Sequence, residues 1–108
     1  MDTIKKLKIL LNSLKRLKKE VNYYNKELNE NNIKLNKMKE ENKDKYDIKK
    51  QQEIVDETNM MIPDATKRLQ NKINDFENFM QDAQFELNLD EEIMKEINDV
   101  SEILKSGF

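Results

Sequence analysis

The side chains that could carry chemistry in this chain are carboxylates, ammonium groups and amides. Its 108 residues include 22 Asp and Glu and 20 Lys and Arg, but no His and no Cys. This composition removes the commonest general base at neutral pH, thiolate nucleophiles, disulfides and the usual zinc ligands. A carboxylate pair would have to be buried, with a perturbed pKa, to act as acid and base or to hold a metal. The helical pattern described below places most carboxylates on solvent faces instead.

A Gly-rich loop that could bind phosphate is also missing, because the sequence contains a single Gly. No nucleophile lies in a context that would activate it. We therefore predict a protein that is not an enzyme and that needs no cofactor and no metal.

The basic segment KKLKILLNSLKRLKK, residues 5–19, is amphipathic. A helix that lies on a membrane, or one that binds calmodulin, has the same pattern. The apolar stripe of this segment continues in register beyond the basic stretch, as a helix in a bundle requires. No aromatic residue is interleaved among these lysines, which disfavours nucleic-acid binding. We predict no nucleic-acid partner and no membrane partner, and keep a peripheral membrane helix as a third hypothesis.

The segment NMMIPDATKRL, residues 59–69, contains the only Pro of the chain. At about 100° per residue, Pro63 and Met60 lie on the side of a helix that points away from Ile62. Pro63 removes the hydrogen bond to the Asn59 carbonyl and crowds it, so the helix should bend away from the proline, toward the core. Met60 is apolar and flexible, which suits an adaptable contact with a partner protein.

Long helices would have to position these side chains. Starting at Thr3, positions spaced alternately four and three apart form an apolar seam with one further polar member, Asn31. The seam consists of Leu7, Leu10, Leu14, Leu17, Val21, Tyr24, Leu28, Asn31, Leu35 and Met38. It predicts one helix over about residues 3–41.

A second seam repeats every seven residues and keeps its phase through Pro63, which predicts a helix over about residues 46–86 that is bent and not ended. Asp44 or Asp47 could cap its start. The seam consists of Ile48, Val55, Ile62, Leu69, Phe76 and Ala83, joined by Ile73, Met80 and Leu87.

A third apolar stripe predicts a helix of about residues 89–105, roughly half as long. Asn88 would be its N-cap, with Glu91 completing a capping box, and Lys105 and Gly107 would end it. The stripe consists of Ile93, Ile97, Val100 and Leu104.

Short connections between these helices favour antiparallel neighbours. The predicted fold is all-α, an elongated up-down-up three-helix bundle with coiled-coil-like packing and a proline bend in the second helix, forming one domain over residues 1–108. Charge supports this order: residues 1–40 hold eleven Lys and Arg against five Asp and Glu, whereas residues 74–108 hold two against ten. The third helix should therefore lie beside the first half of the first helix, leaving only two helices at the other end.

The segment YDIKKQQEIVDETNMMIPDATKRL, residues 46–69, resembles the central segment of the tubulin-specific chaperone A family, also called tubulin-folding cofactor A. The words YDIKKQ and MMIPD, their separation and the following RL carry the resemblance. The resemblance implies an elongated three-helix bundle with a proline-bent second helix. It also implies a cytoplasmic, cytoskeleton-associated protein that binds β-tubulin after chaperonin release and holds it for handover to other tubulin-folding cofactors.

The two matching words also indicate which residues would contact β-tubulin. Ile48 and Ile62 lie on the seam, and we expect them to be structural. The candidate contacts are Tyr46, Asp47, Lys49, Lys50, Gln51, Met60, Met61, Pro63, Asp64, Lys67 and Arg68. The alternative from another class is a structural coiled-coil adaptor, whose seams bind another helical protein or a second copy of the chain. We expect a monomer or a homodimer.

Overall fold

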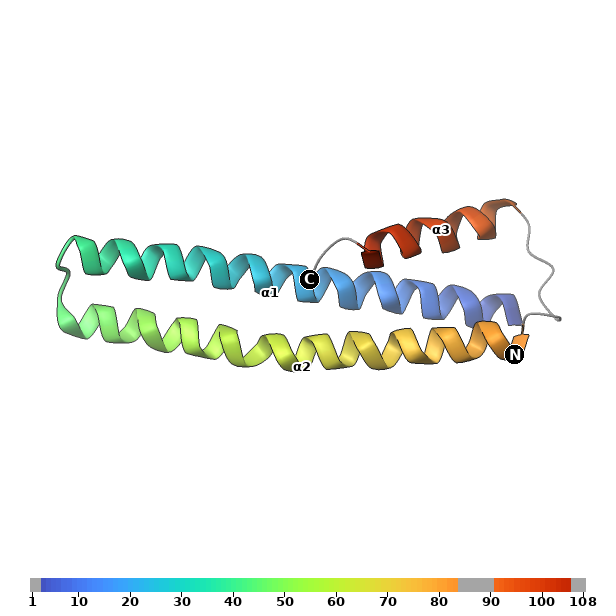
Figure 1. The fold of residues 1–108 in the computed structure, drawn as a ribbon, viewed down its shortest axis with the longest axis horizontal. Coiled ribbons are helices and arrows are strands. Elements are labelled where there is room, and N and C mark those ends of the chain that lie inside the picture. Colours follow the sequence, from blue (N-terminus) through green and yellow to red (C-terminus); the bar gives the residue numbers. More distant parts are fainter. Residues whose placement is uncertain (1–2, 84–90, 106–108) are drawn as a thin grey trace.

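A computed structural model describes residues 3–83 and 91–105, which form three helices and no strand. The helices are α1 (Thr3–Glu40), α2 (Lys45–Ala83) and α3 (Glu91–Lys105). In Figure 1, α2 runs back along α1, and α3 then follows the first half of α1 in the same direction as α1. The molecule measures 63 × 21 × 17 Å. The predicted elongated up-down-up bundle is confirmed.

The predicted helix boundaries differ from these bounds by few residues where they can be compared. α1 ends at Glu40 and α2 begins at Lys45. The predicted end of the second helix at 86, the start of the third at 89, and the roles of Leu87, Asn88 and Gly107 lie outside the described residues.

The turn between α1 and α2 is built without glycine. Asn42 has a φ of 53°, in the left-handed region that asparagine tolerates better than most residues. The Lys43 N–H donates to the Met38 carbonyl at 3.0 Å, and the Asn42 N–H donates to the Lys39 carbonyl at 3.2 Å. These two bonds form a Schellman motif, which satisfies carbonyls at the end of α1 and reverses the chain.

The first turn of α2 starts from Asp44. The Ile48 N–H donates to the Asp44 carbonyl at 3.0 Å, so Asp44 occupies the N-cap position, one of the two that the sequence allowed. Asp47 lies inside the first turn, where its negative charge is favourable next to the helix N-terminus.

The seam of α1 lies in the interior as predicted, but α1 also buries a second stripe. Every predicted seam position from Leu7 to Met38 is buried or half-buried. Leu11 and Lys18, which are outside that seam, have no exposed surface. The first half of α1 packs against two helices, so it needs two buried faces, and the second one lies toward α3. A single apolar seam in the sequence does not reveal this face.

The seam of α2 is more complete than the predicted heptad repeat. Val55 and Leu69 are buried, and between the predicted positions lie Gln51, Thr58 and Ala65, all buried as well. Polar or small side chains occupy these alternate positions, so hydrophobicity alone does not reveal them. α2 continues as one helix through Pro63. The bend at Pro63 stays a prediction.

The main core lies where three helices meet. It combines side chains from the first half of α1, the second half of α2 and α3: Leu7, Leu11, Leu14, Leu17, Val21, Ala65, Leu69, Ile93 and Val100. Among the described residues, the backbone of α3 comes close to α1 and not to α2. Lys15 on α1 and Glu96 on α3 form an ion pair at 3.8 Å, in line with the predicted charge attraction. None of the helices described is long and apolar enough to cross a membrane.

Candidate protein-binding surface

Most of the predicted contact residues lie on the outward face of α2, the side opposite its seam. Among the described residues, Met60 is the most exposed of the large apolar side chains, at 76%. Ten of the eleven candidates are exposed on α2: Tyr46, Asp47, Lys49, Lys50, Met60, Met61, Pro63, Asp64, Lys67 and Arg68. The structure therefore brings all but one of the predicted residues onto the surface of the same helix.

Met60 and Met61 form an apolar spot between two carboxylates. Together with Glu57 and Asp64 they line a shallow hollow on the surface of α2. Glu57 was not among the predicted contacts, although its position three residues before Met60 places it on the same helix face. The hollow offers a flexible apolar surface that is flanked by two carboxylates.

Tyr46 and Lys50 form the second part of the surface, near the turn. The Lys50 Nζ atom lies 5.5 Å from the centroid of the Tyr46 ring, within range of a cation–π contact. The Tyr46 ring lies beside Lys50 on the surface of α2, and Tyr46 is 63% exposed. Tyr46 and Met60 are fourteen positions apart in the sequence, so they lie about 21 Å apart along the helix axis.

Gln51 differs from the other candidates because it is buried. Its side chain is only 3% exposed, and its Nε2 donates to the backbone carbonyl of Asn31 on α1 at 3.0 Å. Asn31 is the polar member of the α1 seam, so two polar residues meet where the seams face each other. Gln51 joins α1 to α2 and offers no surface to a partner.

Arg68 is exposed but engaged within the molecule. Its Nη2 bonds Glu20 Oε1 on α1 at 2.6 Å, and its Nη1 bonds Asp64 Oδ2 one turn earlier on α2 at 3.1 Å. The bond to Glu20 joins α2 to α1, and the bond to Asp64 lies within α2. Arg68 therefore orients Asp64 on the outward face, while Lys67 beside it points to solvent.

The outward face of α2 carries apolar, aromatic and charged side chains. Across residues 3–83 and 91–105, no group of three acidic side chains is close enough to hold a metal ion. Away from this face, in the hollow between α1 and α3, burial lowers the pKa of the Lys18 ammonium group. What α2 presents is a helical strip with an aromatic and basic end and a Met-rich, acidic middle.

A comparison with protein families matches residues 2–101 to the family described as Tubulin binding cofactor A. The tubulin-folding cofactor A of Arabidopsis thaliana is 41% identical over 75 residues, which are 69% of this chain and 66% of that protein. The tubulin-specific chaperone A of Homo sapiens is 45% identical over 67 residues, 62% of each protein. The matches thus span slightly less than two thirds of these relatives.

The same similarity holds in three dimensions. The crystal structure of tubulin folding cofactor A from Arabidopsis thaliana aligns with a TM-score of 0.83 at 33% identity, covering 96% of this chain and 97% of that chain. The likeness extends over all three helices and is not confined to the segment around Pro63.

Proposed function

The chain belongs to the tubulin binding cofactor A family, and from this we propose that it is a tubulin-folding cofactor. In this proposal it binds β-tubulin after release from the chaperonin and holds it for handover to other tubulin-folding cofactors during assembly of the α/β-tubulin heterodimer. It would act in the cytoplasm and in association with the cytoskeleton, without a cofactor.

The exposed methionine pair is the observation that supports this proposal most directly. Met60 and Met61, at 76% and 50% exposure, lie within the segment whose sequence resembles the family. A partner that covered them would remove apolar surface from water, and the flexible thioether side chains could adapt to its shape. Met60 and Met61 do not take part in the packing of α2 against α1, because the seam of α2 is on the other side of the helix.

The mode of action that fits this surface is holding. A helical strip without an enclosed cavity covers a region of β-tubulin that would otherwise aggregate. Release follows when a competing partner covers the same region, because no step of the bundle's own chemistry drives it. Such a cycle requires moderate affinity and a dissociation rate that allows exchange.

Co-elution tests this proposal. Purified protein is mixed with β-tubulin freed from α-tubulin and separated by size-exclusion chromatography, with α-tubulin alone in a parallel run as the control. We expect a complex with β-tubulin. If the two proteins elute separately across micromolar concentrations, the proposal is wrong.

The coiled-coil adaptor is the less favoured function, because the seams that it would offer to another helix are already used. Leu35 of α1 and Val55 of α2 are buried between these two helices. Sedimentation equilibrium separates the two functions in part: an adaptor that self-associates through its seams forms a stable oligomer, whereas a folded three-helix bundle whose seams are used internally can remain a monomer.

A further inference from the structure

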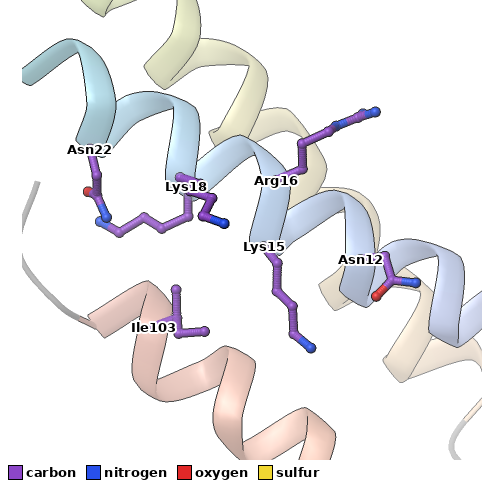
Figure 2. Close-up of a pocket in the computed structure, with 7 residues that line it drawn as sticks. Asn12, Lys15, Arg16, Lys18, Asn22 and Ile103 are labelled. Atoms are coloured by element: carbon purple, nitrogen blue, oxygen red, sulfur yellow. The ribbon is translucent and has the colours of Figure 1, made fainter.

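We propose that the outer face of α1, beside α3, is a second binding site, which takes an acidic polypeptide segment carrying an apolar side chain. This site is separate from the outward face of α2. A hollow between α1 and α3 is its centre, lined by Asn12, Lys15, Arg16, Lys18, Lys19, Asn22 and Ile103. Figure 2 shows Ile103 pointing from α3 toward α1 and Lys15 pointing from α1 toward α3.

The lining of the hollow is basic and contains no acidic residue. Arg16 and Lys19 are exposed, and neither forms an ion pair with any described residue. Lys8, Asn12, Lys15 and Lys19 follow one another at spacings of four, three and four, which places them on one face of α1. No Asp or Glu occurs from Thr3 to Lys19. Positive charge therefore accumulates along this part of the helix.

The packing of α3 accounts for only part of this charge. Glu96 of α3 forms an ion pair with Lys15, and the side chain of Lys18 is completely buried. Arg16 and Lys19 remain on the solvent side of α1 and contribute to neither contact. The positive charges of Arg16 and Lys19 repel each other and the charges of Lys15 and Lys18. This repulsion destabilises the folded chain. A bound anion would relieve this repulsion.

The apolar floor of the hollow favours a peptide over a small anion. Ile103 is 37% exposed there, and the aliphatic stems of the lysines extend the apolar surface. We call the row formed by Lys8, Asn12, Lys15 and Lys19 the basic stripe. Lys8 and Lys19 are eleven positions apart, so the basic stripe is about 16 Å long. A polypeptide with carboxylates on both sides of one apolar residue would place that residue on Ile103 and its charges along the stripe.

A membrane surface fits the same stripe less well. A helix that binds in the interface inserts its apolar face among the lipids. In α1 that face is already used, because Leu7, Leu11 and Leu14 are fully buried in the bundle. Only charge would remain to attract a vesicle.

The test uses a labelled twelve-residue peptide of glutamates with one central leucine, and measures binding to the full chain by fluorescence anisotropy at low salt. We expect saturable binding that weakens at high salt, and no binding of a peptide with lysine in place of each glutamate. Arg16→Glu with Lys19→Glu should weaken binding about tenfold or more. Lys34→Glu with Lys37→Glu is the matched control, because both residues are exposed on the same helix with the same spacing. This control should bind within about twofold of the unchanged chain.

Three results would overturn the proposal. Equal binding by the Arg16 and Lys19 variant, with its helical circular dichroism intact, would place the peptide elsewhere. Equally weakened peptide binding by the control variant would show that binding depends on the net charge of the chain and not on this site. Vesicles of phosphatidylcholine and phosphatidylserine that bind through Arg16 and Lys19 more tightly than the peptide would assign the stripe to a membrane. Failure of the β-tubulin experiment would leave this site unaffected, since the peptide assay does not involve α2.

Discussion

In the half of the bundle that contains α3, the buried core is aliphatic apart from Lys18, whereas the half formed by α1 and α2 alone buries Gln51 and Thr58 among its few core residues. Thr58 satisfies its hydroxyl by donating to the Ile54 carbonyl at 3.0 Å, and Gln51 bonds across to α1. Two helices bury less apolar surface than three, so each position of the two-helix seam stabilises the fold less.

Among the described residues, large exposed apolar side chains are more numerous in the two-helix half, although Ile9, Met94 and Ile103 are exposed in the other half. Large exposed apolar side chains of the two-helix half include Tyr46, Ile54, Met60 and Ile33, with exposures from 44% to 76%. We therefore expect the three-helix half to supply most of the stability, while α2 carries the proposed β-tubulin surface in the two-helix half and at its border. Regions that bind partners commonly have lower local stability.

Truncation of a core leucine in each half tests this division with the largest expected effect. Leu14→Ala should lower the free energy of unfolding by about 3 to 5 kcal/mol, because the side chain is surrounded by three helices and leaves a cavity. Leu35→Ala should cost about 2 kcal/mol, because water can reach a cavity between two helices. Urea denaturation followed by circular dichroism measures both. An equal or reversed order would remove the distinction between the halves.

Pro63→Ala should act in the opposite direction. The proline lacks an N–H for the Asn59 carbonyl, so the substitution should raise the free energy of unfolding by about 1 to 3 kcal/mol. Thermal unfolding measures the gain. Weaker β-tubulin binding by this more stable variant would show that the bend contributes to recognition, and a loss of stability would show that α2 requires the proline.

Gln51 permits a finer test of the polar seam. Gln51→Ala should cost about 1 kcal/mol, because it removes one hydrogen bond to Asn31 and some packing. Gln51→Leu should recover that loss, since the Asn31 carbonyl keeps its partner within α1 and the new side chain is apolar. If leucine is as destabilising as alanine, the stability of the two-helix half depends on the hydrogen bond of Gln51 and not on its small amount of buried apolar surface.

Lys18 gives a pH dependence in the three-helix half. Burial lowers the pKa of its ammonium group below the usual 10.5, so between the folded pKa and 10.5 the unfolded chain binds more protons than the folded one. The contribution of Lys18 to stability should therefore rise with pH through that window. Lys18→Met keeps the length of the side chain without the charge. As the pH rises through that window, the unfolding free energy of the unchanged chain should increase relative to that of the Lys18→Met variant. A difference between the two that stays constant with pH would contradict this prediction.

The sequence predicts the fold well where one apolar face is enough. The α1 seam, the continuation of α2 through Pro63 and the pairing of basic α1 with acidic α3 all follow from spacing and charge. Leu11 and Lys18 were missed because their burial depends on a second neighbour of α1. Gln51 was predicted as a contact but is buried, and the ion pair of Arg68 with Glu20 was not predicted. Both features depend on the register between α1 and α2, which a single sequence does not contain.

The proposed contact surface is tested most directly by one apolar-to-charged substitution in a matched pair. Met60→Glu is compared with Ile33→Glu, which introduces the same charge at an apolar α1 residue that is 59% exposed. The measurement is the Kd for β-tubulin, with thermal unfolding of each variant as the check on folding. We predict that Met60→Glu weakens binding about tenfold or more with almost no change in Tm, because an exposed charge costs the free bundle little. Ile33→Glu should bind within about twofold of the unchanged chain. Full binding by a folded Met60→Glu variant would contradict the assignment of this surface.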